Sequence, residues 1–320
     1  MPSKSKGVCY CTKHIFGKVV IVTGGNSGIG YETAKDLAYR GGRIIIACKN
    51  EEHGIAARDK IIAETGNRNV HFRKLNLASL KSVRQFAEDI LKNKKRIDIL
   101  INNAGIYSSK NVKTEDGLLE GMQVNHFGPF LLTCLLLPIL KMSAPSRIIN
   151  VSSVVYKKGK IDFNNLNMEK ETESSFKGYQ VYYNSKLCNI LMITELSRRL
   201  EGTGVTANSL HPGIVNTNIF KGVDDRFTKI VISMFKCHFK TPWEGAQTTI
   251  YLAVSPEVAS VSGKYFVDCH QEVSSKTSRD PELARKLWEV SEKLVCLNKL
   301  MNDNIQTKSK CKVNTEKLIV

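Results

Sequence analysis

Short apolar runs rich in β-branched residues alternate along this chain with longer segments that repeat apolar residues at helical spacing. We expect strands at 18–23, 43–48, 70–75, 97–101, 147–151, 205–210 and 264–267, and helices at 27–40, 51–65, 79–92, 118–142, 180–201, 242–254 and 281–296. Strands that are apolar on both faces need helices on both sides, and this alternation is typical of a parallel sheet. The sequence therefore predicts an α/β fold with a doubly wound parallel sheet of about seven strands.

The chain of 320 residues is organised as one domain with two polar extensions. The alternating pattern covers residues 17–297, between a basic N-terminal arm (1–16) and a polar, lysine-bearing tail (298–320). Apolar residues make up 42% of the chain and charged residues 24%, values that exclude an intrinsically disordered protein. We expect no membrane-spanning helix, because Pro129, Thr133 and Pro138 interrupt the longest apolar run, and no secretory signal peptide.

The charge balance and the cysteines narrow the possible functions. Lysine and arginine outnumber the acids by 47 to 30, which gives a net charge of +17. Because no zinc-finger or RNA-recognition motif accompanies this charge, we expect no nucleic-acid partner, but a basic surface suited to anionic cofactors or anionic membranes. Nine scattered cysteines without a C-x-x-C pair indicate no metal site. They favour a reduced, intracellular setting, in the cytoplasm or at the surface of the endoplasmic reticulum or another membrane.

A glycine-rich turn separates the first expected strand from the first expected helix. Gly24, Gly28 and Gly30 have the spacing G-x-x-x-G-x-G. Glycine allows a tight turn and the close approach of a ligand, and the N-terminus of the following helix suits a pyrophosphate. In this strand–turn–helix context we predict a Rossmann-type dinucleotide site. Its phosphate contacts are expected from Gly24, Gly25, Asn26, Ser27, Gly28, Ile29 and Gly30.

The residue at the end of the second strand helps to distinguish the two nicotinamide cofactors. An acid at this position would bind the ribose 2′-hydroxyl of NAD. The sequence instead has Lys49, whose ammonium would attract the 2′-phosphate of NADP, and Ser27 offers the same phosphate a hydroxyl. We therefore expect NADP(H) to be favoured over NAD(H), with a solvated strand-end lysine as the alternative reading.

Tyr182 and Lys186 are four residues apart on an expected helix and so share one face. Tyrosine has an ordinary pKa of about 10, and a neighbouring ammonium lowers it. A tyrosine tuned in this way can donate a proton to a carbonyl group during reduction by a hydride donor. Tyr179 and Tyr183 are near alternatives, but neither has a lysine four residues later.

Three further motifs follow expected strands at the same edge of the sheet. N-N-A-G (102–105) follows the fourth strand, Ser152 and Ser153 follow the fifth, and P-G (212–213) follows the sixth. The carboxyl ends of parallel strands meet at the edge where open α/β sheets bind ligands. We therefore expect these motifs, the glycine turn and Tyr182 to surround one crevice.

Taken in this order, the motifs resemble the short-chain dehydrogenase/reductase family over nearly all of residues 17–297. Within that family, the chain looks most like the retinol dehydrogenase group. The segments that carry this likeness are 17–30, 124–133, 150–153, 185–189 and 241–247. The resemblance implies an NADP(H)-dependent oxidoreductase that interconverts an apolar alcohol and its aldehyde or ketone, such as retinol and retinaldehyde or lipid-derived aldehydes.

The resemblance also implies roles for individual residues. Tyr182 would be the general acid/base, and Lys186 would lower its pKa and bind the nicotinamide ribose. Ser153 would hydrogen-bond the substrate carbonyl or hydroxyl, and Asn125 would support a water that links Lys186 to solvent. With Tyr182 and Lys186, the cofactor cleft would be lined by Lys49, Asn76, Leu77, Asn102, Ala104 and Gly105. The segment Pro212, Gly213, Ile214 and Val215, with Thr217, would flank the nicotinamide.

Three features depart from the family's usual pattern. Asn76 stands where relatives usually carry an aspartate for the adenine amino group, and its carbonyl can still accept that hydrogen bond. Lys49 stands where relatives often have arginine, and the lack of a planar fork would weaken recognition of the 2′-phosphate. Several relatives have an N-terminal membrane anchor, and none is expected here.

The sequence leaves the substrate and the partners open. The apolar stretch 218–240 would form either a lid over a small apolar substrate or a helix packed on the core. A non-catalytic dinucleotide sensor or scaffold on the same fold is the alternative function, although a binding module needs no acid/base. The basic arm around Cys9 and Cys11, whose acylation is left open, would allow peripheral contact with a membrane. A homo-oligomer is also left open.

Overall fold

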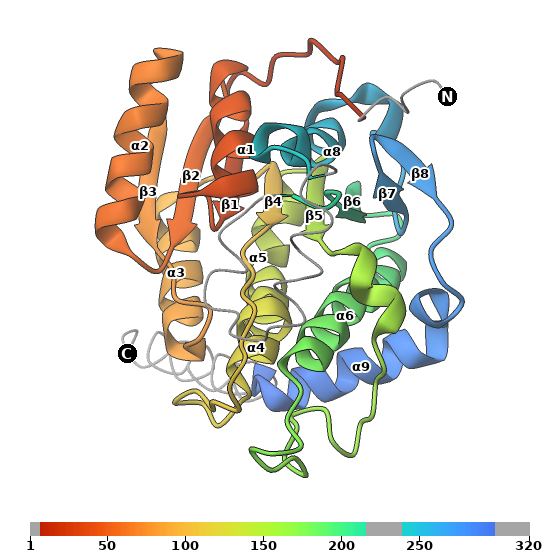
Figure 1. The fold of residues 1–320 in the computed structure, drawn as a ribbon. Coiled ribbons are helices and arrows are strands. Elements are labelled where there is room, and N and C mark those ends of the chain that lie inside the picture. The colour runs from red at the N-terminus through yellow and green to blue at the C-terminus, as the bar shows by residue number, and fades with distance from the viewer. Residues whose placement is uncertain (1–6, 216–238, 298–320) are drawn as a thin grey trace, which may run out of the picture.

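The computed structural model describes residues 7–215 and 239–297 of the chain. Thr217 and residues 218–238 of the apolar stretch therefore lie outside the described residues, as does the tail at 298–320. In the described part, eight strands form one sheet in the order β3-β2-β1-β4-β5-β6-β7-β8 (Figure 1). The strands are β1 (Val19–Thr23), β2 (Arg43–Cys48), β3 (Val70–Lys74), β4 (Ile99–Asn102), β5 (Ser146–Val151), β6 (Val205–His211), β7 (Tyr265–Val267) and β8 (His270–Glu272).

Strands β1 to β7 pair in parallel, which confirms the expected seven-stranded parallel sheet. Strand β8 was not expected from the sequence. It pairs antiparallel with β7 at the edge of the sheet, and its three residues are all exposed. Because β8 buries no apolar face, it carries none of the apolar pattern that marks the other strands.

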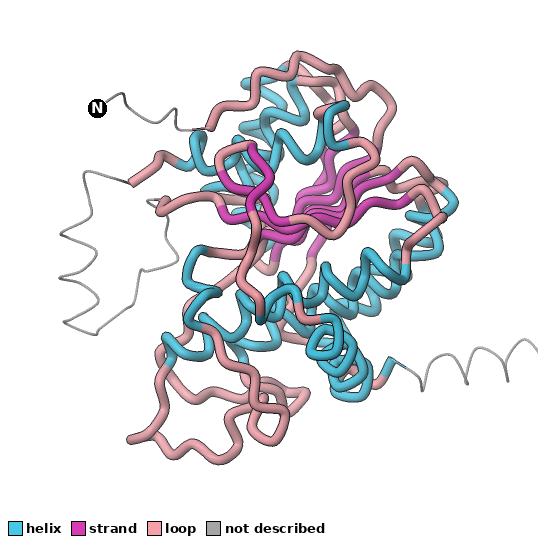
Figure 2. Tube along the Cα trace, turned by 90° about the vertical axis from the view of Figure 1, so that its right-hand side faces the viewer, coloured by secondary structure: helices cyan, strands magenta, loops and turns pink. Residues whose placement is uncertain are grey.

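Helices cover both faces of the sheet, as Figure 2 shows with the strands between two helical layers. The longer helices are α1 (Gly28–Tyr39), α2 (Glu51–Thr65), α3 (Leu80–Asn93), α5 (Gly128–Met142), α6 (Gly178–Arg199), α8 (Pro242–Val254) and α9 (Pro281–Leu294). Successive residues of β1 serve opposite layers: Val20 and Val22 pack with the cluster that includes α1, α2 and α8, while Val19 and Ile21 pack with α3, α5, α6 and α9. Each such buried side chain contributes roughly 1.5–3 kcal/mol, so the two layers hold the sheet from both sides.

Local capping fixes several helix ends at their expected places. The Asn50 side chain accepts a hydrogen bond from His53 N at the start of α2, and Gly66 ends that helix at φ 70°. Ser79 caps α3 in the same way as Asn50 caps α2. Thr241 begins α8 with a reciprocal capping box that includes Glu244. Short helical turns complete the described elements: α4 (Glu120–Met122), η1 (Gln123–Phe127), η2 (Val154–Lys158), η5 (Pro256–Val258) and η6 (Thr277–Arg279).

The expected helix at 118–142 is divided into α4, a π-helical turn η1 and α5. Together, Glu120–Met142 is long and apolar enough to cross a membrane by composition, with a mean hydropathy of 1.4 over its most apolar window. However, 72% of that window is buried inside the protein, where α5 packs against α3. Its apolar character is that of a core helix.

The last described helix, α9, lies across α6 and α5 on the same side of the sheet. The Trp288 ring packs edge-on against Phe130 of α5 at 4.8 Å between centroids, and the Arg199 guanidinium of α6 lies 4.5 Å from the Trp288 centroid. Ser291 hydrogen-bonds the buried His126 ring at 2.9 Å. Helix α9 therefore packs on α6 and contacts α5 through the Trp288 ring.

The N-terminal arm is attached to the domain from Gly7 onward. Its backbone accepts two hydrogen bonds from Arg40, at the oxygens of Cys11 (2.6 Å) and Lys13 (3.1 Å). Cys9 N donates to the side chain of Gln247 in α8 at 3.1 Å. The arm thus reaches from α1 to α8, over the top of the sheet in the view of Figure 1.

Candidate active site

A cavity of about 720 Å³ opens at the carboxyl ends of the parallel strands. Strand order reverses between β1 and β4, and the loops after β1, β2, β4, β5 and β6 all contribute to its walls. This is the crevice in which doubly wound sheets bind ligands. Its volume falls in the range that holds a small organic ligand.

The glycine turn forms one end of the cavity, with a backbone that only glycine fits. Gly24 and Gly28 have φ values of +66° and +55°. A Cβ atom on Gly30 would lie 2.3 Å from the Gly24 carbonyl oxygen. Ser27 is the N-cap of α1 and makes no side-chain capping bond to the helix. The turn and the helix N-terminus together form a cradle that fits a dinucleotide pyrophosphate.

Residues after β2 and β3 line the neighbouring wall. Lys49 is exposed there and lines the cavity, as do Asn76 and Leu77. The Asn76 Oδ1 atom accepts a hydrogen bond from Ala78 N at 3.1 Å. An amide oxygen has two lone pairs, so one remains for an adenine amino group.

Two residues expected in the cofactor cleft do not line it. Gly25 faces the interior, where a Cβ atom would meet the Val22 carbonyl oxygen at 3.2 Å. Asn102 is 4% exposed, and its Nδ2 atom donates to Thr133 Oγ1 (2.9 Å) and Asn150 Oδ1 (2.8 Å). Because side chains alternate along a strand, Asn102 points into the helical layer.

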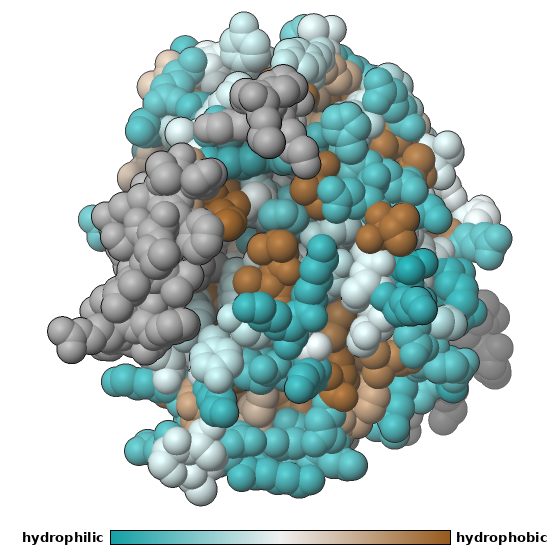
Figure 3. All heavy atoms as spheres, turned by 45° about the vertical axis from the view of Figure 1, so that its right-hand side comes forward, coloured by the Kyte–Doolittle hydropathy of each residue, from teal (hydrophilic) through white to brown (hydrophobic). Residues whose placement is uncertain are grey.

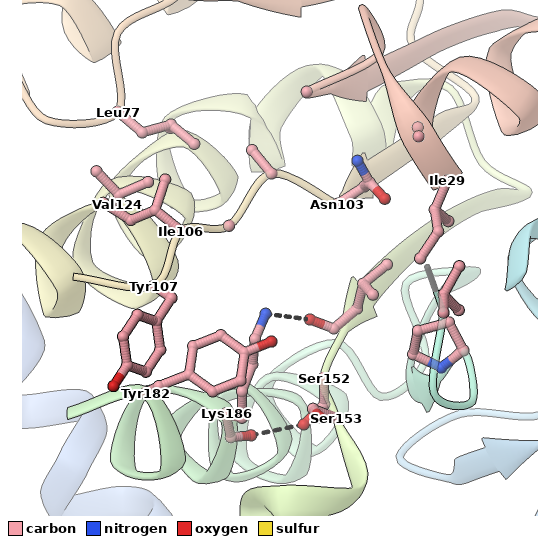
Figure 4. A pocket seen from close by; sticks show the side chains of 18 of the residues that line it. Ile29, Leu77, Asn103, Ile106, Tyr107, Val124, Ser152, Ser153, Tyr182 and Lys186 are labelled. Carbon is pink, nitrogen blue, oxygen red and sulfur yellow. Dashed lines mark hydrogen bonds between the residues drawn. The ribbon is translucent and has the colours of Figure 1, made fainter. Parts of the chain in front are cut away.

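The next residue, Asn103, takes the place expected for Asn102 at the cavity wall (Figure 4). Its Nδ2 atom donates to the Thr23 carbonyl oxygen at 2.9 Å. The backbone nitrogens of Asn103 and Ala104 both donate to Thr23 Oγ1 at 3.0 Å. These bonds lock the loop after β4 to the end of β1, and Ala104 and Gly105 line the cavity as expected.

Tyr182, Lys186 and Ser153 meet at the other end of the cavity (Figure 4). Tyr182 and Lys186 come from α6, and the Lys186 Nζ atom lies 5.4 Å from the Tyr182 ring centroid. Lys186 Nζ donates to the Val151 carbonyl oxygen at 3.2 Å. Ser152 Oγ donates to the Lys186 carbonyl oxygen at 2.7 Å, which ties the loop after β5 to α6.

The ionisation of this pair differs from the expectation that Lys186 lowers the pKa of Tyr182. Tyr182 is partly exposed to the cleft, yet burial raises its pKa to about 12, and a hydrogen bond from Ser153 only partly opposes this. Lys186 is 3% exposed, and burial lowers its pKa to about 8. Desolvation disfavours the charged forms of both groups. Around neutral pH the structure therefore holds a phenol beside a buried ammonium.

Asn125 braces the site from behind and does not line the cavity. It is 1% exposed and lies in the π-helical turn η1. Its Oδ1 atom accepts from Ile106 N (2.8 Å), and its Nδ2 atom donates to Ile106 O (2.9 Å) and Ser185 Oγ (3.0 Å). These bonds join the loop after β4 to α6. Asn125 thus positions the loop beside Tyr182.

Apolar and aromatic side chains make up most of the remaining wall near Tyr182. The Tyr107 and Tyr182 rings lie 6.2 Å apart between centroids (Figure 4). These wall residues are Ile106, Tyr107, Val124, Val154, Val155, Tyr179, Tyr183, Ile214 and Phe239, with Glu120 as the acidic exception. No motif in the sequence marks Ile106, Tyr107, Val154 or Val155. Pro212, Gly213 and Val215 line the cavity as expected. The described residues hold no cluster of three His, Cys, Asp or Glu side chains that would bind a metal ion.

This arrangement brings the glycine turn and the side chains of Tyr182, Lys186 and Ser153 into one cavity. Known proteins resemble this chain in sequence and in fold. The family described as short chain dehydrogenase matches residues 18–165. Human retinol dehydrogenase 14 is 47% identical over 88% of this chain and 88% of its own length. Human retinol dehydrogenase 11 is 45% identical, covering 90% of this chain and 88% of that protein.

Solved structures share the fold. An uncharacterized protein from Mycobacterium Paratuberculosis superposes with a TM-score of 0.72 at 30% identity, covering 88% of this chain and 95% of that one. A short chain dehydrogenase from Burkholderia cenocepacia in complex with NADP superposes with a TM-score of 0.64 at 24% identity, covering 79% and 97%. At that identity the second likeness bears on the fold alone.

Proposed function

Because the chain belongs to the short-chain dehydrogenase/reductase family of oxidoreductases, we propose that it interconverts an apolar alcohol and its aldehyde or ketone with NADP(H). The observation that carries this proposal is the meeting of Tyr182, Lys186 and Ser153 in the cavity that the glycine turn closes at its other end. A non-catalytic dinucleotide sensor would need the glycine turn but not this set of side chains.

Each side chain has a defined task in carbonyl reduction. The nicotinamide supplies the hydride when the cofactor is bound. Tyr182 keeps its proton around neutral pH, since burial raises its pKa to about 12, and it donates that proton to the carbonyl oxygen. Ser153 would donate a hydrogen bond to the same oxygen, and Lys186 would bind the nicotinamide ribose. In alcohol oxidation the Tyr182 phenolate would accept the hydroxyl proton, so this direction requires Tyr182 to have lost its own proton first.

The preference for NADP(H) rests on the charge at the end of β2. Lys49 lines the cavity and is exposed, so its ammonium is free to reach a 2′-phosphate. A carboxylate at the same place would bind a ribose hydroxyl and repel that phosphate. We therefore assign the lysine a role in selecting the phosphorylated cofactor.

The substrate class follows from the wall around Tyr182 and from the relatives. The side chains there are largely apolar or aromatic, which favours a hydrocarbon over a sugar or an acid. Two relatives with about 45% identity carry the name retinol dehydrogenase. We propose retinol and retinaldehyde, or lipid-derived aldehydes, as substrates.

We further propose an intracellular protein that contacts membranes peripherally. Apolar side chains on the face in Figure 3 lie in separate groups within a largely hydrophilic surface. The net charge of +17 would attract the chain to anionic lipid headgroups.

The experiment that tests the activity is a substrate panel with the purified full chain. All-trans-retinaldehyde, hexanal and nonenal are each offered with NADPH or NADH, and cofactor oxidation is followed. Tyr182→Phe is expected to lower turnover by about 10²–10⁴-fold with NADPH affinity nearly intact. Tyr183→Phe is the matched control, because Tyr183 lines the same cavity without a lysine four residues later.

Two results would contradict the proposal. Near-normal turnover in Tyr182→Phe would remove this tyrosine as the proton donor. Tight NADPH binding by the wild type without oxidation by any carbonyl compound would favour the sensor instead.

A further inference from the structure

The loop after β6 forms one wall of the cleft, and a buried lysine lies behind it. Gly213, Ile214 and Val215 line the cavity, whereas Lys240 does not. Lys240 N donates to the Ile214 carbonyl oxygen at 2.8 Å, and Lys240 pairs with Val215 in a parallel bridge. Gly213 has φ +89°, and a Cβ atom there would lie 2.7 Å from Lys240 Cδ and 2.9 Å from Cε. The lysine stem thus packs directly against the back of the loop.

The position of this stem is set by a partner for its charge. Lys240 is 8% exposed, and its ammonium forms an ion pair with Asp268 in the turn between β7 and β8. Burying an ammonium without a partner is strongly unfavourable. Asp268 therefore determines where the Lys240 ammonium, and with it the stem behind Gly213, can lie.

Asp268 is itself held in an uncommon backbone conformation by the N-terminal arm. Asp268 and Cys269 have φ values of +50° and +63°, a region that residues other than glycine seldom adopt. Cys269 N donates to Thr248 Oγ1 in α8 at 3.2 Å. Gly7 of the arm packs on the turn so closely that a Cβ atom on it would lie 2.3 Å from Asp268 Cα, and its carbonyl oxygen accepts from Cys269 Sγ at 3.6 Å.

We propose that Lys240 is a positioning residue for the loop that flanks the nicotinamide, and that Gly7 supports it through Asp268. The N-terminal arm is then part of the cofactor site, although it precedes the first strand. This inference rests on the proposed function, because it takes the loop after β6 as the nicotinamide wall. Strands β1, β4 and β5 lie between this loop and the loop after β2. The support should therefore affect the nicotinamide half of the cofactor and not the adenosine half.

The first test compares two probes on the full chain: NADPH, and 2′,5′-ADP, which carries only the phosphorylated adenosine half. Lys240→Met keeps an aliphatic stem behind Gly213 and removes the charge, and Asp268→Asn leaves the buried ammonium without its carboxylate. We expect each to raise the Kd for NADPH by about tenfold or more, because a displaced loop misplaces its ligand contacts. The Kd for 2′,5′-ADP should stay within about twofold. The Kd of the double variant for NADPH should not exceed that of the single variant with the higher Kd. The reason is that the two substitutions remove the same interaction, the Lys240–Asp268 ion pair.

The second test uses the arm and remains decisive if the lysine variants fail to fold. Gly7→Ala and Gly17→Ala both place a side chain at positive φ, +51° and +72°. Only Gly7→Ala meets Asp268, because a Cβ atom on Gly17 has nothing within 4 Å. We expect Gly7→Ala to weaken NADPH binding and lower kcat/KM, with 2′,5′-ADP binding kept and Gly17→Ala resembling the wild type.

The outcomes separate this inference from the proposed function. If the wild type binds neither probe, the proposed function fails. If the wild type binds both and all variants bind NADPH with wild-type affinity, only the positioning role fails. Parallel loss of both probes, or equal effects of Gly7→Ala and Gly17→Ala, would also overturn it, because a general loss of structure would then explain the result.

Discussion

Replacement of Lys186 by methionine is expected to abolish activity and at the same time to stabilise the fold. Burial lowers the pKa of Lys186 from 10.5 to about 8, so the folded chain holds its ammonium less favourably than the unfolded chain does. At about 1.36 kcal/mol per pKa unit, the difference corresponds to roughly 3 kcal/mol of lost stability. Methionine is similar in length and carries no charge. The Val151 carbonyl oxygen keeps a partner in the variant, because Asn189 Nδ2 also donates to it at 3.3 Å.

The pH dependence of this gain has a definite sign. Below pH 8 the lysine is protonated in both states, and the variant keeps its full advantage. Between about 8 and 10.5 the folded lysine loses its proton while the unfolded lysine keeps it, so the stability of the wild type rises with pH. The advantage of the methionine variant should therefore shrink through this window and disappear near pH 10.5.

Urea unfolding of both proteins without added cofactor, at pH 7 and at several values through this window, measures the effect. Lys81→Met is the matched control, because Lys81 is exposed on α3 and should show no such pH-dependent gain. A Lys186→Met variant that is no more stable than the wild type below pH 8 would refute the reasoning. A gain that does not change with pH would refute it as well, since better packing alone would explain it.

Three further perturbations give distinct results. Lys49→Asp should shift the ratio of kcat/KM values from NADPH towards NADH, and equal use of both cofactors by the wild type would contradict the role of Lys49. Asp98→Asn should lower the free energy of unfolding by about 1–3 kcal/mol, because buried Asp98 accepts from Val19 N and pairs with Lys18 and Arg96. Burial raises the pKa of Asp98, but these bonds outweigh it and hold the pKa below its usual value, so the contribution of Asp98 should be lost as acid unfolding begins. High salt or carbonate should release the protein from membranes, and a need for detergent would contradict peripheral binding.

Much of the fold follows from local sequence, because buried strands and amphipathic helices have different apolar periods. The bounds of β2, α2 and α8 coincide with the expected segments. The π-helical turn η1 could not be foreseen, since its residues continue the apolar pattern of the helices on either side. The turn depends on tertiary bonds such as those of Asn125 to Ile106 and Ser185.

The candidate site could be predicted from the sequence where a motif has a fixed backbone shape. It was less predictable where burial decides the direction or the ionisation of a side chain. The glycine turn and the spacing of Tyr182 and Lys186 are local features that spacing reveals. Asn103 lines the cavity in place of Asn102, and this outcome depends on which face of β4 each side chain occupies. The N-N-A-G motif alone does not show which of the two faces the cavity. The raised pKa of Tyr182 depends on the protein packed around the phenol. The spacing of Tyr182 and Lys186 in the sequence gives no information about that packing.

Helix α9 has a consequence for how the protein is made. Tyr182 and Lys186, the pair proposed for catalysis, lie on α6, yet this helix packs against Pro281–Leu294, near the end of the described chain. During synthesis, every residue assigned to chemistry leaves the ribosome before the segment that shields their helix from water. A transcript that stopped short of residue 281 would encode the whole reaction centre, but its product would expose the apolar faces of α5 and α6 and be a target for chaperones and proteases.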